Sequence, residues 1–275
     1  MNPSQPPFFE LVAGEGPIVG AAIHAGHAVR ADVLPQLLAD DATRLREEDP
    51  HTQRLAAAAP SRIIGCRSRF EVDLNRPRHQ AVYLKPEHAW GLDVWREPLP
   101  REAVDQSLAN YDLFYAATRT LLESLAARHG FVVVLDIHSY NHRRDGAHGP
   151  EADPAANPEV NLGTASIDRA LWGPLVDRFL GDLHGHDLLG QRLDVRENVK
   201  FQGGHFPRWI NANFPATVCA IAVEFKKTFM DEWTGEVDEF HLHALHTALS
   251  ATLPGLTASL AALSSQREPA PVGSP

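Results

Sequence analysis

The sequence has few cysteines and no excess of basic residues. Its 275 residues include only Cys66 and Cys219, too few for a disulfide framework, which fits a reducing cytoplasm; a single bridge between them stays open. The 35 acidic residues outnumber the 25 basic ones, and the formal charge is −10. Nucleic-acid-binding proteins usually carry a basic excess, so we expect no nucleic-acid partner. An anionic substrate would need local arginines and a metal ion to attract it, because the net charge repels it.

Long apolar runs are also missing. No stretch is long enough to cross a bilayer, and residues 1–10 lack the basic start and apolar run of a signal peptide. We therefore expect a cytoplasmic protein with no membrane contact. The sequence does have a hydrophobic fraction of 44%, ordinary for a protein with a sizeable core, and 15 histidines. Histidine is the commonest metal ligand and also a routine surface residue, so the positions of these histidines decide their meaning.

Strand-like apolar runs alternate with helix-like segments along the chain. Residues 131–137, FVVVLDI, form a nearly unbroken β-branched run, as in strands covered on both faces. Further strands are expected at residues 17–24, 61–66 and 218–225. Helices are expected at residues 31–46, 100–129, 166–184 and 238–253. This alternation predicts an α/β fold of three layers, α/β/α, with a mixed, mainly parallel central sheet.

One domain is expected over residues 1–263. Its last long helix should end at Pro254 and Gly255, with a short helical piece up to residue 263. Residues 264–275 are rich in Ser, Pro, Gly and charge, which predicts a disordered tail. Residues 141–164 form a second polar stretch, and a loop of this length inside a compact domain is usually functional.

Three of the expected strands end in residues that can carry chemistry: His24, His138 and Glu224. Sites in α/β sheets form beyond the carboxyl ends of the strands, so these side chains are expected to converge. Asp136 lies two residues before His138 and shares its face of the strand, as an acid that supports a metal-bound imidazole would. Taken singly, each has an ordinary interpretation: a loop histidine, a strand-end hydrogen bond, or a salt bridge from Glu224 to a neighbouring lysine.

Two charged segments could complete such a site. Residues 46–52, REEDPHT, hold acids that would usually form a solvated face, but one carboxylate would complete a His, Asp/Glu, His set for zinc. Residues 68–78, SRFEVDLNRPR, are dense in arginine and keep Phe70, Val72 and Leu74 on one alternating face. Such a segment could hold guanidinium groups for two-pronged recognition of a carboxylate, and the alternative is a charged edge strand.

Six segments carry a resemblance to a known family: IHAGH, REEDPHT, SRFEVDLNRPR, LDIHSYNHRRDG, NVKFQGGHFPRW and VEFKK. In this order they resemble the N-formylglutamate amidohydrolase family, which is related to zinc carboxypeptidases and aspartoacylase-like deacylases. The resemblance extends from about residue 18 to residue 230, and its arginine-rich segment is the most specific part. It implies a phosphorylase/hydrolase-like fold.

The resemblance also implies roles for individual residues. One zinc ion would be bound by three ligands: His24, Asp49 and His138. The substrate carboxylates would be held by Arg69, Asn75 and Arg76, and Glu224 would be the general base. Asp49 is preferred as the acid because its spacing to Leu55 matches the family. Glu48 stays an alternative, as does His27, which stands where zinc carboxypeptidases place a glutamate ligand.

The expected function is that of a metal-dependent amidohydrolase. It would cleave the N-acyl amide, for example the N-formyl amide, of a small anionic substrate such as N-formylglutamate. A carboxypeptidase-like peptidase or another N-deacylase could use the same site. A catalytically inactive metal-binding protein is the alternative from another class, but such a protein needs no base beside its metal. His205, in a Gly-Gly-His segment, is a further candidate for the pocket wall.

Overall fold

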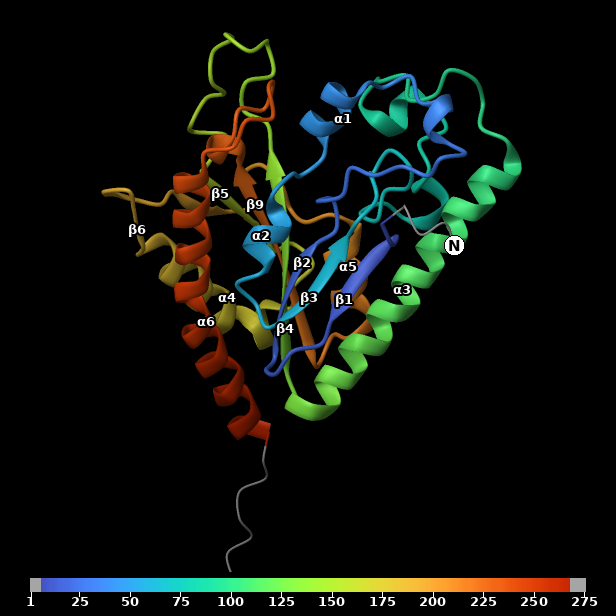
Figure 1. Ribbon diagram of the computed structural model, residues 1–275. Coiled ribbons are helices and arrows are strands. Elements are labelled where there is room, and N and C mark those ends of the chain that lie inside the picture. The colour runs from blue at the N-terminus through green and yellow to red at the C-terminus, as the bar shows by residue number, and fades with distance from the viewer. Residues whose placement is uncertain (1–5, 268–275) are drawn as a thin grey trace, which may run out of the picture.

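The computed structural model describes residues 6–267, which fold into a seven-stranded sheet between two layers of helices (Figure 1). The strand order is β1-β3-β2-β4-β9-β5-β8. The strands are β1 (Phe9–Val12), β2 (Ile18–Ala22), β3 (Ser61–Gly65), β4 (Val132–Tyr140), β5 (Val160–Gly163), β8 (Val195–Glu197) and β9 (Val218–Lys226). β1 pairs antiparallel with β3, and β5 with β9, whereas the other neighbours are parallel. The predicted α/β class with a mixed, mainly parallel sheet is confirmed.

The centre of the sheet is formed by β4 and β9. Every residue of β4 is buried, as its apolar run predicts for a strand covered on both faces. The two strands pair in parallel over their whole length, and this register puts His138 directly opposite Glu224. His138 and Glu224, both expected to carry chemistry, are therefore neighbours on two hydrogen-bonded strands.

Separate hydrophobic cores fill the two faces of the sheet. On one face, α3 (Arg101–His129) and α5 (His205–Asn213) pack against alternate residues of β4, including Val132 and Val134. On the other face, α2 (Thr52–Ala56), α4 (Arg169–His184) and α6 (Glu239–Arg267) pack against residues such as Val133 and Leu135. Figure 1 shows α3 and α6 on opposite sides of the sheet. The period of two along a strand is what divides these residues between the cores.

Shorter elements complete the described chain. They are the helix α1 (Asp41–Glu47), the two-stranded hairpin of β6 (Asp187–Leu188) and β7 (Gln191–Arg192), and four 3-10 turns. The turns are η1 (Leu34–Gln36), η2 (Arg78–Gln80), η3 (Pro86–Ala89) and η4 (Lys227–Phe229). The segment at residues 68–78 is irregular rather than a strand, although Phe70, Val72 and Leu74 are all buried.

Three sequence predictions of element boundaries are wrong. The helix expected at residues 31–46 is divided into η1 and α1, because Asp40 starts a new helix by accepting a hydrogen bond from the Thr43 backbone N–H (2.8 Å). The last helix does not end at Pro254, since the buried Leu256 and Leu260 anchor its second half in the core. It continues to Arg267, so residues 264–267 are helical and not part of a tail. The rest of the predicted tail lies outside the described residues.

Two further features bear on expectations from composition. Within residues 6–267, no helix combines the length and the hydropathy that crossing a membrane requires. Cys66 and Cys219 both carry free thiols, so the bridge left open by the sequence is not formed.

Candidate metal centre and cavity

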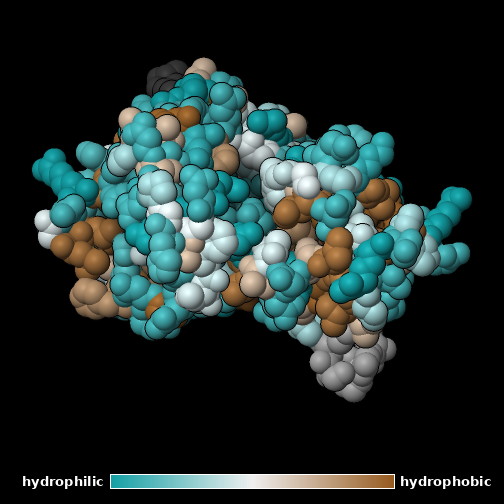
Figure 2. Space-filling view, turned by 90° about the horizontal axis from the view of Figure 1, so that it is seen from above, coloured by the Kyte–Doolittle hydropathy of each residue, from teal (hydrophilic) through white to brown (hydrophobic). Residues whose placement is uncertain are grey.

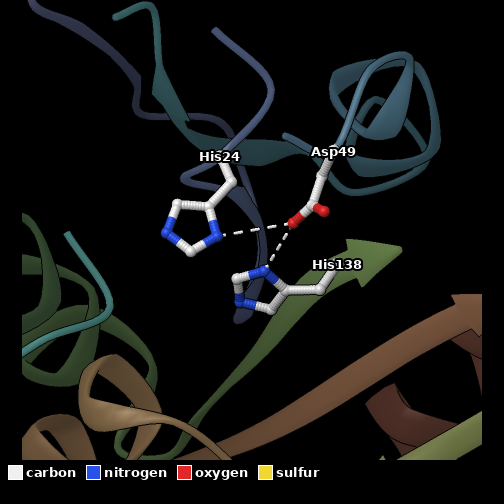
Figure 3. Close-up of side chains that lie close together, drawn as sticks. All are labelled: His24, Asp49 and His138. Atoms are coloured by element: carbon white, nitrogen blue, oxygen red, sulfur yellow. Dashed lines mark hydrogen bonds and ion pairs between the residues drawn. The ribbon is translucent and has the colours of Figure 1, made fainter. Parts of the chain in front are cut away.

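Three side chains converge at one end of the sheet: His24, Asp49 and His138 (Figure 3). His24 closely follows β2 and His138 lies near the end of the adjacent parallel strand β4, so both reach the same edge. Asp49 follows α1, and its backbone N–H donates to the carbonyl of His24 (3.0 Å). Asp49 Oδ2 lies 2.8 Å from His138 Nδ1 and 3.4 Å from His24 Nδ1. All three side chains are buried, and one ligand atom from each lies within 4.8 Å of the others.

A second carboxylate faces the other nitrogen of each imidazole ring. His24 Nε2 donates to Asp73 Oδ1 (2.7 Å), and Asp136 Oδ2 lies 3.0 Å from His138 Nε2. Outer carboxylates of this kind fix the ring orientation and the tautomer, which leaves Nδ1 available to a metal ion. His24 Nδ1 is buried and has no hydrogen-bond partner within the described residues. A buried nitrogen with no hydrogen-bond partner, beside a carboxylate and a second imidazole, is chemically suited to bind a metal ion.

The charge balance around the two rings also fits a bound cation. Burial alone would raise the pKa of Asp49, but the neighbouring His138 and His24 bring it well below the ordinary value. Asp73 and Asp136 are fully buried beside the same rings, and Asp73 is further paired with Arg69. Two imidazoles and one carboxylate form the donor set that zinc takes in hydrolytic sites. The residues present therefore fit the metal that the sequence led us to expect.

The two alternative ligands bind each other instead of joining this cluster. His27 Nδ1 donates to Glu48 Oε2 (2.6 Å), and Glu48 also accepts a hydrogen bond from the Ser68 hydroxyl. The His27 side chain is 39% exposed, whereas the three clustered residues are buried. The structure thus places Asp49 between the histidines and keeps His27 and Glu48 away from them.

Glu224 lies on β9, opposite His138 and next to the cluster. Burial raises the pKa of Glu224 to about 7, although the neighbouring His138 acts in the opposite direction. The lysines that follow it are engaged elsewhere. Lys226 Nζ donates to the Asn157 carbonyl (3.1 Å), and Lys227 Nζ donates to the carbonyls of Arg46 (2.5 Å) and Glu48 (2.8 Å). Within residues 6–267 no ion pair holds Glu224, so the expected rival, a salt bridge to lysine, is not formed.

A cavity of about 650 Å³ opens over the cluster and Glu224. Seen from above, the surface is hollowed near the middle of the molecule and largely hydrophilic there (Figure 2). Its basic lining residues are Arg46, Arg69, Arg76, Arg144, Lys200, Arg208 and Lys227, against the acids Glu47, Asp49 and Glu224. A chain of net charge −10 therefore concentrates positive charge in this cavity, which suits an anionic ligand.

The two candidate arginines are held to different degrees. Arg69 donates to Asp73 Oδ2 (2.8 Å), to the Glu47 carbonyl (3.2 Å) and to the Tyr83 hydroxyl (3.2 Å). Arg76 has only a long contact to the His88 carbonyl (3.5 Å) and a 3.8 Å approach to Asp73, and its side chain is 35% exposed. Arg76 consequently keeps more of its donor groups for a ligand than Arg69 does.

Asn75 connects this segment to the metal cluster and to α5. Its Nδ2 lies 3.4 Å from His138 Nε2, and its Oδ1 accepts from the Phe206 backbone N–H (2.8 Å). A Cβ on Gly204 would come within 2.3 Å of the Asn75 amide, so any larger residue at this position would displace the Asn75 side chain. His205, the further candidate from the sequence, also lines the cavity.

Several residues of the site were missed by the sequence analysis: Trp90 and Lys227 line the cavity, and Asp73 and Tyr83 contact residues that line it. Asp73 and Lys227 have charged side chains, which are normally exposed, yet both are fully buried. The only sequence signal for Asp73 is its place two residues before Asn75, inside the arginine-rich segment already singled out. Nothing in the sequence marks Trp90 as a cavity residue, because its position there depends on the conformation of the backbone after η3.

Comparisons with known proteins agree with this geometry. No match was found among curated proteins. An N-formylglutamate amidohydrolase from Ralstonia eutropha JMP134 has a similar structure, with a TM-score of 0.68 and 20% identity over 94% of this chain and 98% of that one. A gene product of Agrobacterium tumefaciens is similar with a TM-score of 0.61 and 17% identity, over 94% of this chain and 96% of that one. At these identities the likeness shows the fold.

A family model shows more than the fold. The model described as N-formylglutamate amidohydrolase matches residues 16–230, which include all six segments of the sequence resemblance. This range also contains every residue of the cluster and its cavity. The chain therefore belongs to the N-formylglutamate amidohydrolase family and is a hydrolase of the amidohydrolase type.

Proposed function

We propose that this chain is a zinc-dependent amidohydrolase that removes the N-acyl group, in the first instance the N-formyl group, from an acidic amino acid such as glutamate. The observation that carries the proposal is the convergence of His24, Asp49 and His138 beside Glu224, at the floor of a cavity rich in basic residues. A reducing cytoplasm is the proposed location, which the two free thiols support.

The metal ligands and the base have separate roles in this reaction. Zinc held by His24, Asp49 and His138 would acidify a water molecule and polarise the scissile carbonyl. Water adds to the acyl carbon, the C–N bond breaks, and the products are the free acid and the amino acid. Glu224 accepts the proton of the water and delivers it to the leaving nitrogen. A carboxyl whose pKa is about 7 has both protonation states populated near neutral pH, as this shuttle requires.

Arg69, Asn75 and Arg76 are proposed to hold the substrate carboxylate. A planar guanidinium matches a carboxylate with two parallel hydrogen bonds, and this contact places the acyl carbonyl against the cluster. Arg76 is the stronger candidate for direct contact because the protein uses so little of its donor capacity. Arg69 is fixed by Asp73 and Tyr83, so it supplies positive charge from a set position.

An N-deacylase that also accepts acyl groups larger than formyl is the second candidate, and the size of the cavity favours it. A volume of about 650 Å³ lies within the range of sites for drug-sized ligands, and a formyl group occupies little of it. Larger acyl groups on the same acidic amino acid would use the same ligands and the same base. An inactive binding protein is disfavoured, since Glu224 is buried beside the cluster and no other described residue forms an ion pair with it.

The test is a panel of N-formyl, N-acetyl and N-succinyl derivatives of glutamate, aspartate and a neutral amino acid, assayed with zinc-loaded protein for release of the free amine. We expect the acidic N-formyl compounds to be hydrolysed fastest. The His138→Ala variant should lose zinc and activity, whereas His27→Ala, which alters a histidine outside the cluster, should keep both. Hydrolysis of none of these compounds by the zinc-loaded wild type would refute the proposal.

A further inference from the structure

Trp90 occupies an unusual position at the edge of the cavity. It ends η3 with φ 55° and ψ 27°, in the left-handed region, and Gly91 follows with φ 93°. Bulky residues rarely adopt this conformation, and such strain persists only where the surroundings enforce it. Among the described residues, four non-glycine residues have a positive φ, namely His51, Trp90, Leu189 and Asn198, and of these only Trp90 lines the cavity.

The Trp90 side chain is also 51% exposed, which is unfavourable for a large aromatic ring unless it has a partner. Its partners are the two candidate carboxylate-binding residues. The guanidinium carbon of Arg69 lies 4.8 Å from the centre of the indole ring, and that of Arg76 lies 5.9 Å from it. Both distances fall within the range in which a cation is attracted to an aromatic face.

Tyr83 connects the indole to the metal cluster. The ring of Tyr83 meets Trp90 edge-on, with ring centres 6.0 Å apart. The hydroxyl of Tyr83 donates to Asp73, the same carboxylate that accepts hydrogen bonds from Arg69 and His24. Trp90 is therefore the solvent-facing end of a continuous set of contacts that begins at a proposed metal ligand.

Arg76 depends on this ring more than Arg69 does. Arg69 has three hydrogen-bonding partners in the protein, whereas the Arg76 side chain has a long 3.5 Å contact to the His88 carbonyl and a 3.8 Å approach to Asp73. An aromatic ring against a guanidinium restricts its orientation without using its N–H groups, so these groups stay free for a ligand. The ring also removes water from the guanidinium surface that it contacts, which strengthens the attraction of the two arginines for an anion.

We propose that Trp90 is a positioning residue for recognition of the substrate carboxylate: it orients the Arg76 guanidinium toward the cavity, together with Arg69, and covers both from solvent. The left-handed backbone at residues 90 and 91 is what directs the indole over the arginines. This inference rests on the proposed function in one respect, that Arg69 and Arg76 bind a carboxylate of the substrate.

The kinetic test is Trp90→Ala against N-formylglutamate. Loss of the stacking should raise KM about tenfold and change kcat by less than about twofold, because the ring contacts the binding groups and not the reacting atoms. Trp90→Phe keeps an aromatic face and should restore most of the affinity. A neutral derivative of the same substrate, with both carboxylates as amides, should be insensitive to Trp90→Ala.

A binding measurement that needs no turnover uses glutarate, a dicarboxylate without an amide bond. Titration of the wild type should change the tryptophan fluorescence, and the change should be absent from Trp90→Phe, which keeps the other four tryptophans. Glutarate should bind Trp90→Ala about tenfold more weakly than the wild type. Failure of the proposed hydrolysis would leave this measurement intact, so the two hypotheses can fail separately.

Leu84→Ala is the matched control. Leu84 lies in the same part of the chain and is 52% exposed, but it does not line the cavity. Its removal should leave KM and glutarate affinity unchanged. Equal KM and equal glutarate affinity in Trp90→Ala and the wild type would overturn the inference, and so would an equal loss of affinity for the neutral diamide.

Discussion

The paired strands β4 and β9 and the segment at residues 68–91, which includes the turns η2 and η3, bring side chains to the same cavity by different means. On the strands, backbone register alone puts His138 opposite Glu224. In the segment, Arg69 and Trp90 are held by contacts between side chains. In the proposed mechanism, the base Glu224 and the metal ligand His138 thus lie on paired strands, whereas the recognition groups lie on a segment held by contacts between its own side chains. We expect variants on the strands to lower kcat, and variants in the segment to raise KM or weaken metal binding.

The largest effect is expected on the strands, from Glu224→Gln. The amide keeps the shape of the side chain and cannot accept the proton of the water, so kcat should fall by ~10²–10⁴-fold. Zinc content and the melting temperature should stay close to those of the wild type. Lys226→Gln is the control, because that lysine donates to the Asn157 carbonyl and not to Glu224. A nearly normal kcat in Glu224→Gln would show that Glu224 is not the general base.

Asp73→Asn tests the point at which the two regions meet. Asp73 accepts from His24 Nε2 at 2.7 Å and from Arg69 at 2.8 Å, so the segment supports His24, the proposed metal ligand that follows β2. Loss of such an outer carboxylate should weaken zinc binding about 10–100-fold, measured by competition with a chelator. Glu71→Gln is the matched control, since Glu71 is a buried acid of the same segment that pairs with Arg30. Equal zinc affinities in both variants would show that the regions are independent.

A smaller effect, confined to substrate binding, is expected from Arg76→Lys. Lysine keeps the charge but cannot make two parallel hydrogen bonds, so KM for N-formylglutamate should rise about tenfold while kcat changes little. Arg78→Lys alters an arginine of the same segment that pairs with Asp112 on the surface, and it should have no effect. A fall in kcat with unchanged KM in Arg76→Lys would show that Arg76 acts in the chemical step and not in substrate binding.

The same division explains how much of the molecule could be predicted from its sequence. The central strands were predictable because unbroken apolar runs have few alternatives, and His24, His138 and Glu224 were found because each closely follows or ends such a run. The continuation of α6 through Pro254 was not predictable, because it depends on burial of Leu256 in the core. Tertiary packing there outweighs the usual effect of proline on a helix.

For the segment at residues 68–91, the sequence predicted the chemistry of the side chains but not their arrangement. Its arginines indicated a carboxylate site, but the alternation of Phe70, Val72 and Leu74 was compatible with a strand that the structure does not contain. Asp73 is buried against His24, and Trp90 contacts Arg69 and Arg76, so both positions depend on residues that are not neighbours in sequence. Such contacts leave no periodic signal in a single sequence.

Metal dependence is the central claim, and removal of the metal tests it most directly. Amine release from N-formylglutamate should be measured before chelation, after removal of metal by a strong chelator and dialysis, and after addition of one equivalent of zinc. Because two buried histidines and Asp49 converge on one point, we predict that activity disappears with the metal and returns with zinc. Full activity in chelated protein that contains no metal by elemental analysis would contradict the account.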